Sequence, residues 1–322
     1  MVAKFKVLII GLGQIGMGYD IDASPEELLV THASSFAQSD NFEIVAGIDR
    51  DQEKQDRFSK RYDCSAYKSI SELPDKDVDV VVIAVPTQYH FEVCNEVLDC
   101  MQPLAVLCEK PFTESSVEAR IVAEKAGRKQ IQFYVNYMRL CDPAVLRLKK
   151  QISSKEIVSP FKGVVWYSKG LFNSASHFVN LLQFWFGKVT SIEGMSSVVH
   201  RDEDSSPSFM LKFDQAEIVF MGLDERNYFH NSLELFSANG RILYQGGGKL
   251  VSRFGIDCDS LFSGYKVLSS EGDFYPDSFN FLQKGVTEHL ANALESKSSS
   301  ICDVETAIKT LEVLERVNKL YE

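Results

Sequence analysis

The chain has 322 residues, of which 45% are hydrophobic and 25% are charged, the composition of a globular protein with a sizeable core and room for two domains. Its formal net charge of −11 argues against nucleic acid or an anionic membrane as the main partner, because phosphate binding needs a basic surface. No stretch reaches the roughly 18 uninterrupted apolar residues of a transmembrane helix. The seven cysteines include no CxxC pair, which predicts reduced thiols in a cytoplasmic protein and no metal site.

The first 137 residues alternate between apolar strand patterns and helical patterns. One helical pattern covers 115–128, where Ser115 or Ser116 is in position to cap the helix. Continuous apolar strands separated by helices predict a parallel sheet covered on both faces, which is a doubly wound α/β domain of the Rossmann type over residues 1–137. The expected strands are 5–11, 42–49, 78–86, 103–109 and 131–137.

The pattern changes after residue 140. A strand over 161–170 and an apolar helix over 174–186 are followed by several strand patterns joined by short turns, which predict a mostly antiparallel sheet. These strands are 208–213, 216–223, 232–238 and 240–247. Two amphipathic helices close a second domain of the α+β class, over residues 138–322. Their apolar positions are Phe279, Leu282, Val286, Leu290 and Leu294 in the first and Val304, Ile308, Leu311, Leu314 and Val317 in the second.

A glycine loop follows the first strand directly. Its GxGxxG spacing, in Gly11-Leu12-Gly13-Gln14-Ile15-Gly16, is typical of a dinucleotide-binding turn. The first glycine permits the tight turn, the second lets backbone approach a pyrophosphate, and the third lets the helix pack closely on the strand. Backbone amides of the loop and the following helix, including those of Gln14 and Ile15, would hold the phosphates. The alternative is a glycine turn without a ligand.

The second strand ends at Asp49, where a carboxylate can accept both ribose hydroxyls of NAD and would repel a 2′-phosphate. Asp49 lies 38 residues after Gly11, although about 20 are usual. The excess falls in residues 18–31, which indicates an insertion or a lengthened first helix segment. Arg50 could tolerate NADP, so NAD is favoured and NADP stays open. Asp49 can also be a solvated carboxylate at a strand end.

Two further strand ends carry candidate residues. Pro86 and Thr87 follow the third strand at the carboxyl edge of the sheet, where such folds bind ligands, and His90 can either start a helix or contact a ligand. Lys110 ends the next strand on the same edge, where it can stabilise a developing alkoxide, with Glu109 orienting it. Alternatively, Glu109 and Lys110 form a surface ion pair at a strand tip.

A histidine near the start of the apolar helix is the remaining candidate. Asn173 or Ser174 is expected to cap this helix, and His177 lies in its first turn with Asn180 one turn further on. The positive end of the helix dipole lowers the pKa of a histidine, and a neutral imidazole can accept the proton of a hydroxyl while hydride leaves the carbon. The alternative is a structural histidine on an apolar helix.

Taken together, the glycine loop, the segment 84–90, the Glu-Lys-Pro sequence at 109–111 and the histidine helix resemble the glucose–fructose oxidoreductase/inositol dehydrogenase/MocA (Gfo/Idh/MocA) family over nearly the whole chain. The resemblance implies that Lys110 contacts substrate and cofactor and that His177 is the acid/base. Residues 137–143, with Arg139 and Pro143, resemble the family's segment between domains. Further substrate contacts are expected at Arg139, Lys169, Asn173 and Tyr228.

The implied function is an NAD(P)-dependent oxidoreductase that transfers hydride between a nicotinamide and a secondary alcohol or ketone of a sugar or nucleotide-activated sugar. Many family members carry aspartate where this chain has Asn173 and Asn180, and glycine where it has Ala175. Asparagine positions a hydroxyl but cannot relay a proton, so His177 would act without a carboxylate helper. Two alternatives are an NAD-dependent glycosidase using transient oxidation and a non-catalytic cofactor-binding sensor.

The resemblance also bears on assembly. In the family, the open sheet of the second domain usually packs against a copy of itself, which hides an apolar face. We therefore expect a homodimer or homotetramer, with a sugar-type small molecule as the other partner.

Overall fold

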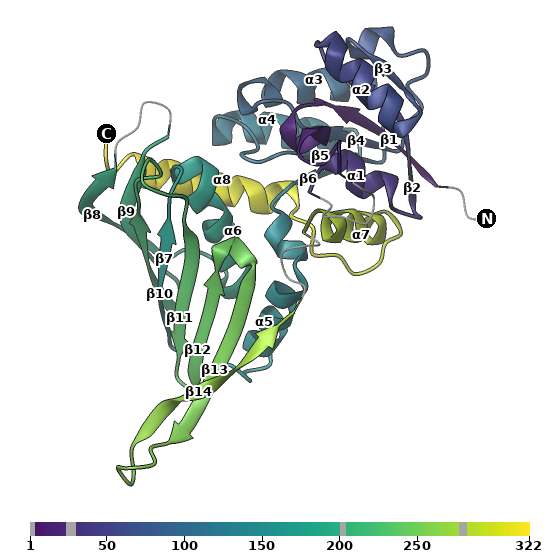
Figure 1. Ribbon diagram of the computed structural model, residues 1–322. Coiled ribbons are helices and arrows are strands. Elements are labelled where there is room, and N and C mark those ends of the chain that lie inside the picture. The colour runs from purple at the N-terminus through teal and green to yellow at the C-terminus, as the bar shows by residue number, and fades with distance from the viewer. Residues whose placement is uncertain (1–3, 24–29, 200–203, 277–281) are drawn as a thin grey trace. The chain divides into compact units, whose positions relative to one another are not determined.

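The computed structural model describes residues 4–23, 30–199, 204–276 and 282–322, with backbone only for 196–198, and divides the chain into two compact units (Figure 1). The first unit is Met1–Cys141 with Asn280–Lys309, and the second is Asp142–Phe279 with Thr310–Glu322. The expected single boundary between residues 137 and 138 therefore does not describe the C-terminal part, because 280–309 joins the first unit. Phe279, expected on a closing helix, lies outside the described residues.

The first unit contains a six-stranded parallel sheet in the order β3-β2-β1-β4-β5-β6, the order of a doubly wound dinucleotide-binding fold. All four residues of β4 and of β5 are buried, as expected for strands covered on both faces. The five predicted strands are confirmed, and only the short, polar β3 was not predicted. The strands are β1 Phe5–Ile10, β2 Phe42–Ile48, β3 Ser65–Tyr67, β4 Val80–Ile83, β5 Ala105–Cys108 and β6 Gln132–Val135.

Helices surround this sheet. Ser115 caps α4 by accepting a hydrogen bond from the Glu118 amide, as predicted. The α-helices of the first unit are α1 His32–Ala37, α2 Gln52–Tyr62, α3 His90–Cys100, α4 Ser116–Arg128 and α7 Leu282–Leu294, and α8 Val304–Asn318 runs from this unit into the second. A π-helix spans Gln14–Gly18, and 3₁₀ turns span Ile70–Glu72, Thr87–Tyr89 and Met138–Cys141.

The C-terminal helix α7 completes the core of the first unit. Figure 1 shows it beside α1, and its Val286, Leu290 and Ala291 are buried in the same apolar cluster as Val7 and Phe36. Burial of these side chains against β1 and α1 stabilises the fold by the hydrophobic effect, which explains why a segment so late in the chain belongs to the first unit.

The lengthened segment between the glycine loop and α1 is held by one carboxylate. Buried Asp20 accepts hydrogen bonds from the Val30 and Thr31 amides and from the hydroxyls of Thr31 and Ser34. Residues 24–29 of the segment lie outside the described residues. The four hydrogen bonds fix the start of α1 and therefore the position of its first residue, His32.

The second unit contains an eight-stranded sheet in the order β14-β13-β12-β11-β7-β10-β9-β8, in which every pair is antiparallel except β7 with β10. The mostly antiparallel sheet is confirmed, but β8, β13 and β14 were not predicted. The strands are β7 Phe161–Tyr167, β8 Ser191–Val199, β9 Ser206–Lys212, β10 Ala216–Gly222, β11 Asn231–Ser237, β12 Gly240–Gln245, β13 Leu250–Cys258 and β14 Lys266–Tyr275.

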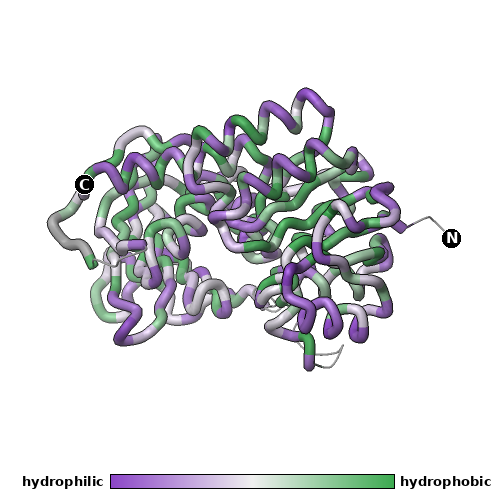
Figure 2. The backbone as a smooth tube through the Cα atoms, turned by 90° about the horizontal axis from the view of Figure 1, so that it is seen from above, coloured by the Kyte–Doolittle hydropathy of each residue, from purple (hydrophilic) through white to green (hydrophobic). Residues whose placement is uncertain are grey.

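Helices cover one face of this sheet. Phe178 of α6 Ser176–Phe186 packs edge to face on Tyr244 of β12, and α5 Pro143–Ser153 lies on the same side (Figure 1). A π-helix over Leu171–Ala175 precedes α6. Trp166 and Phe236 lie on the other face at alternating strand positions, and their side chains remain 38% and 43% exposed. Figure 2 shows apolar and polar residues alternating along the helices, as expected when each helix buries one face.

Among the described residues, no helix combines the length and the hydrophobicity needed to span a membrane. All seven cysteines are free. Cys94 and Cys108 are both buried, with their sulfur atoms 4.0 Å apart, and burial raises the pKa of the Cys108 thiol well above its ordinary value.

Candidate functional site

The three glycines of the loop have different surroundings. Gly11 has a positive φ of +97°, and a Cβ there would lie 2.5 Å from the Ala84 carbonyl carbon. A Cβ on Gly16 would lie 2.0 Å from the Gly11 oxygen, whereas a Cβ on Gly13 would meet no atom within 4 Å. Gly11 and Gly16 therefore serve internal packing. Gly13 faces open space, which fits the close approach of a ligand to its backbone.

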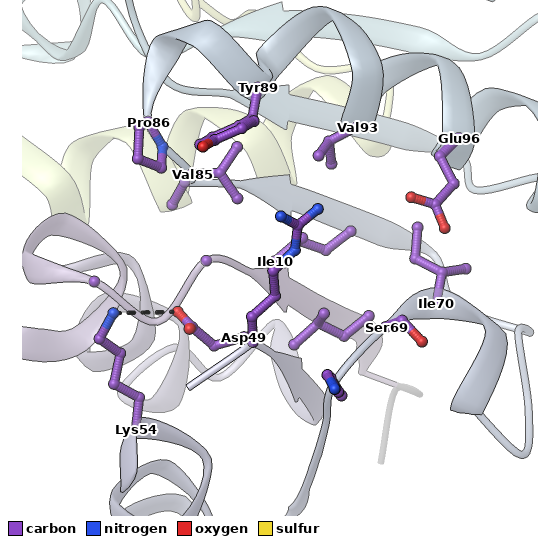
Figure 3. Close-up of a pocket in the computed structure, with 16 residues that line it drawn as sticks. Ile10, Asp49, Lys54, Ser69, Ile70, Val85, Pro86, Tyr89, Val93 and Glu96 are labelled. Carbon is purple, nitrogen blue, oxygen red and sulfur yellow. Dashed lines mark ion pairs between the residues drawn. The ribbon is translucent and has the colours of Figure 1, made fainter. Parts of the chain in front are cut away.

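A cavity of about 270 Å³ lies at the carboxyl edge of the parallel sheet, close to the lower limit of about 300–1,000 Å³ for small-molecule sites. It fits one part of a dinucleotide rather than the whole. Figure 3 shows Tyr89, Val93 and Glu96 on one wall, with Asp49 and Lys54 across from them. The lining residues are Ile10, Gly11, Gly13, Ile48, Asp49, Arg50, Lys54, Lys68, Ser69, Ile70, Ala84, Val85, Pro86, Tyr89, Val93 and Glu96.

Asp49 joins the end of β2 to the glycine loop. Its Oδ2 accepts a hydrogen bond of 2.8 Å from the Leu12 amide, and its Oδ1 accepts one of 3.0 Å from the Asp51 amide. Lys54 Nζ lies 3.7 Å from Oδ2. A carboxylate offers about four acceptor positions, so Asp49 can still accept hydrogen bonds from ribose hydroxyls.

Three cations line the same cavity. Arg50 lies with its guanidinium carbon 5.7 Å from the centre of the Tyr89 ring, and Lys54 and Lys68 complete the set. Asp49 and Glu96 are the acidic residues of the lining. The residues fit an adenosine phosphate, because they combine an acceptor for ribose hydroxyls, a flat aromatic surface and positive charge.

The turn after β5 differs from a surface ion pair. Glu109 is buried, and its Oε1 lies 2.6 Å from Asn136 Nδ2 and 2.8 Å from His32 Nε2. Its Oε2 accepts a hydrogen bond from the Lys110 amide. Burial alone would raise the pKa of the Glu109 carboxyl, but the hydrogen bonds from His32 and Asn136 more than offset it, so the pKa lies below its ordinary value.

His90 does not line the cavity. Its ring is buried, with Nε2 lying 2.8 Å from the Val85 oxygen and Nδ1 lying 2.9 Å from the Pro111 oxygen and 3.1 Å from the Phe112 oxygen. These contacts join the loops after β4 and β5, and His90 also begins α3, which is one of the two alternatives that the sequence left open. Pro86 is exposed and lines the cavity, whereas Thr87 is half-buried at the start of the 3₁₀ turn.

The remaining loop residues and Lys110 are accessible. Gln14 is exposed, and Ile15 is half-buried in the π-helix that follows Gly13. Lys110 is half-buried, and its peptide bond with Pro111 is cis. Arg139 lies buried in the 3₁₀ turn after β6.

In the second unit, the histidine helix begins differently from the expectation that Asn173 or Ser174 caps it. Helical structure starts at Leu171, and Asp204 accepts hydrogen bonds from the Phe172 and Asn173 amides through its two carboxylate oxygens. A carboxylate from another part of the chain thus takes the place of a local cap, because the amides at a helix start need an acceptor.

The other candidates of this unit differ in exposure. His177 is buried in the first turn of α6, and Asn173 is exposed one turn before it. Asn180 is buried and donates a hydrogen bond of 3.0 Å to Thr310 Oγ1, so its amide has a structural partner. Lys169 and Tyr228 are exposed, and Lys169 has a positive φ of 70°.

Sequence patterns did not single out several residues that contact the candidates. His32 and Asn136 contact Glu109, and Gln283 contacts both of them, but the three come from distant segments. Lys68 and Glu96 line the cavity from exposed positions and Lys54 from a half-buried one, and Asp204 caps a helix from a loop. The signal available was position alone, since His32 directly follows the unusual segment 18–31.

The fold agrees with comparisons to known proteins. Residues 5–137 match the family model Gfo/Idh/MocA, described as an oxidoreductase family with an NAD-binding Rossmann fold. D-xylose 1-dehydrogenase (NADP(+)) of Hypocrea jecorina is 30% identical, over 43% of this chain and 37% of that protein. The dTDP-3,4-didehydro-2,6-dideoxy-alpha-D-glucose 3-reductase of Saccharopolyspora spinosa is 25% identical, over 62% of this chain and 66% of that protein.

A solved structure extends the similarity of fold to the whole chain. UDP-N-acetylglucosamine 3-dehydrogenase from Acidithiobacillus ferrooxidans superposes with a TM-score of 0.74 and 15% identity, covering 98% of this chain and 97% of that one. The matched segments of the two curated relatives span between 37% and 66% of their own lengths, so sequence similarity is concentrated in part of each protein.

Proposed function

We propose that this protein is an NAD(P)-dependent sugar dehydrogenase or reductase of the Gfo/Idh/MocA type, because residues 5–137 match the model of that oxidoreductase family with its NAD-binding Rossmann fold. Its substrate is a secondary alcohol or ketone of a sugar or nucleotide-activated sugar. The observation that carries the proposal is the cavity at the carboxyl edge of the parallel sheet, where Gly13 faces open space and Asp49 directly follows β2.

The cofactor in this proposal is NAD, with NADP as the second candidate. Asp49 favours the two ribose hydroxyls of NAD, whereas Arg50, Lys54 and Lys68 would offset the charge of a 2′-phosphate. Gly11, Gly13, Gln14, Ile15 and Gly16 supply the loop around the pyrophosphate. When bound, the nicotinamide accepts or supplies the hydride.

Two side chains are proposed to act on the substrate. The Lys110 ammonium would polarise the reacting oxygen and stabilise negative charge that develops on it. The His177 imidazole would take the hydroxyl proton in oxidation and return it in reduction. Arg139, Lys169, Asn173 and Tyr228 are proposed to bind the sugar, and the xylose dehydrogenase and the dideoxyglucose 3-reductase support a substrate of this class.

The first experiment is a fluorescence titration of the protein with NADH and with NADPH. Tight binding of NADH and much weaker binding of NADPH would support Asp49 as the determinant, and the reverse would assign the site to NADP. Binding of neither would contradict the proposed function. A screen of sugars and sugar nucleotides with the tighter cofactor then identifies the substrate class.

The second experiment tests the proposed role of Lys110. We expect Lys110→Met to lower kcat/KM by about 10²–10³-fold, because the variant loses a charge that stabilises the transition state. Lys60→Met is the matched control, since Lys60 is exposed in the last turn of α2. Turnover by Lys110→Met near that of Lys60→Met would remove Lys110 from the catalytic residues.

Assembly and location are part of the same proposal. We propose a homodimer or homotetramer that forms through the uncovered face of the second sheet, where Trp166 and Phe236 are partly exposed. A cytoplasmic location is supported by the seven free cysteines.

A further inference from the structure

Four buried side chains form a closed ring of hydrogen bonds behind the turn that carries Lys110. Asn136 Nδ2 donates to Glu109 Oε1 at 2.6 Å and to Gln283 Oε1 at 3.1 Å. His32 joins the other two members, with Nε2 lying 2.8 Å from Glu109 Oε1 and Nδ1 lying 2.8 Å from Gln283 Nε2. None of the four residues is more than 9% exposed.

Only one arrangement of protons satisfies this ring. An ionised Glu109 accepts only, so Asn136 must present its NH₂ group to it. The same NH₂ group faces Gln283, which must therefore present its oxygen to Asn136 and its own NH₂ to His32. His32 Nδ1 is then an acceptor, and the ring proton of His32 lies on Nε2, from which it donates to Glu109.

The ring is assembled from four separate parts of the first unit. Asp20 fixes the start of α1 and with it His32, whereas Gln283 comes from α7. Glu109 and Asn136 follow the neighbouring strands β5 and β6. Such a buried polar network is stable only when each member has partners, and it then holds its members in one geometry.

The ring ends on the backbone of Lys110. Glu109 Oε2 accepts the hydrogen bond of the Lys110 amide at 3.2 Å, while Oε1 is held by His32 and Asn136. Further along the turn, His90 contacts the carbonyl oxygens of Pro111 and Phe112, which follow Lys110. Two histidines thus hold the turn at two points, one through a carboxylate and one through backbone.

We propose that His32 is a positioning residue for Lys110, which acts through the Glu109 carboxylate with the ring closed by Asn136 and Gln283. This proposal rests on the proposed function of Lys110. It assigns a purpose to the buried Glu109, to the segment that leads into α1 and to the contribution of α7. A side chain held to about 0.5 Å by such contacts reacts faster than one that must search for its position.

The test compares His32→Leu, which removes the donor to Glu109, with His32→Gln, whose amide can restore one. We expect His32→Leu to lower kcat at least about ten-fold while the Kd for NADH stays within about two-fold, and His32→Gln to recover most of the loss. His289→Gln is the matched control, because His289 is a half-buried histidine of α7 outside the ring. Equal kcat values for His32→Leu and His289→Gln would overturn the proposal.

A second readout does not depend on turnover. Hydrogen exchange measured by mass spectrometry on the peptide that contains the Lys110 amide should be at least about ten-fold faster in His32→Leu than in wild type, because the acceptor of that amide is released. Nitrogen-15 NMR of labelled histidine should show the His32 proton on Nε2, identified by its absence from His32→Gln. A proton on Nδ1, or unchanged exchange in His32→Leu, would contradict the ring.

Failure of the proposed function and failure of the ring proposal give different experimental results. If the protein binds no NADH but the exchange and NMR results hold, the ring stands and the proposed function fails. If His32→Leu does not fold, Gln283→Leu replaces it, since this change removes the donor to His32 Nδ1 and one acceptor of Asn136 but leaves both partners of Glu109 Oε1 in place. Gln283→Leu should then release the Nε2 tautomer and accelerate exchange of the Lys110 amide, and wild-type values of both would refute the proposal.

Discussion

Gly13 is a residue at which a substitution should affect ligand binding but not folding. Its backbone needs no positive φ, since φ is −77°, and a Cβ there would meet open space. Gly16, three residues later, has no room for a Cβ beside the Gly11 oxygen. The two positions carry the same residue for different reasons, so the same substitution should have different effects.

We expect Gly13→Ala to change the free energy of unfolding by less than about 0.5 kcal/mol but to weaken NADH binding at least about ten-fold, because the methyl group occupies the space of the pyrophosphate. Gly16→Ala should destabilise the fold by about 1–3 kcal/mol or more through overpacking against backbone. Urea unfolding and cofactor titration of both variants measure the two effects. If Gly13→Ala binds NADH as wild type does, the loop does not hold the pyrophosphate.

Asp204 is a second single residue whose role can be tested by substitution. Its carboxylate accepts hydrogen bonds from the Phe172 and Asn173 amides at the start of the histidine helix, where the N-cap position is occupied by Gly170, which has no side chain to cap it. We expect Asp204→Ala to lower the free energy of unfolding by about 0.5–2 kcal/mol, as the loss of a helix cap does. Asp204→Asn keeps one oxygen acceptor and should lose less. Equal stability of Asp204→Ala and wild type in urea unfolding would show that the cap is dispensable.

At the level of elements, α7 links its own end to the loop that follows. His289 Nδ1 accepts a hydrogen bond of 2.9 Å from the Ser300 amide, and the Ser299 hydroxyl donates to the His289 oxygen at 2.8 Å. Burial lowers the pKa of His289 below its ordinary value of 6.5. An imidazolium could not accept the Ser300 hydrogen bond, so protonation opposes the folded state.

The lowered pKa of His289 determines how the stability of the protein changes with pH. Below pH 6.5 the unfolded chain binds a proton at His289 that the folded protein does not bind until the pH reaches the lower folded pKa. Neutral His289 therefore contributes its full share of stability above pH 6.5. That share is lost as the pH falls from 6.5 to the folded pKa of His289. We expect wild type to lose more unfolding free energy than His289→Gln between pH 7.5 and about pH 5.5, measured by urea unfolding. Parallel losses would contradict the assignment.

Some strands of this protein can be predicted from their own sequences, whereas others cannot. Strands β4 and β5 are buried at every residue, so their continuous apolar sequences predict a parallel sheet. Strand β14 is exposed at most positions and carries few apolar residues, and for that reason its pattern resembles a loop. The ring around Glu109 and the cap from Asp204 depend on residues far apart in the sequence, and periodicity within one segment contains no information about such contacts.

At the level of the whole molecule, the second sheet leaves one face without helices in the described part of the chain. Trp166, Phe236 and Phe274 are exposed there by 38%, 43% and 62%. Apolar side chains gathered on a broad sheet face are typical of an interface between protein chains. This observation supports the proposed self-association through that face.

We expect light scattering at micromolar concentration to give wild type a mass of two or four times 36.3 kDa. Trp166→Glu should reduce the mass to that of one chain, because an interface buries a carboxylate at a cost of several kcal/mol. Val117→Glu is the control, since Val117 is 67% exposed on α4 of the first unit. A wild-type monomer, or a Trp166→Glu variant of unchanged mass, would exclude the sheet face as the interface.

The return of α7 to the first unit has a consequence for synthesis on the ribosome. Val286, Leu290 and Ala291 complete the core that begins at β1, yet they are translated after the entire eight-stranded sheet. The amino-terminal domain therefore emerges with an open core and becomes complete only once α7 has left the exit tunnel. Both units should therefore finish folding late in translation, because α7 completes the first unit and Thr310–Glu322, which follow α7, complete the second. Until then the apolar side chains around Phe36 lack the cover of α7 for the time needed to make residues 142–279.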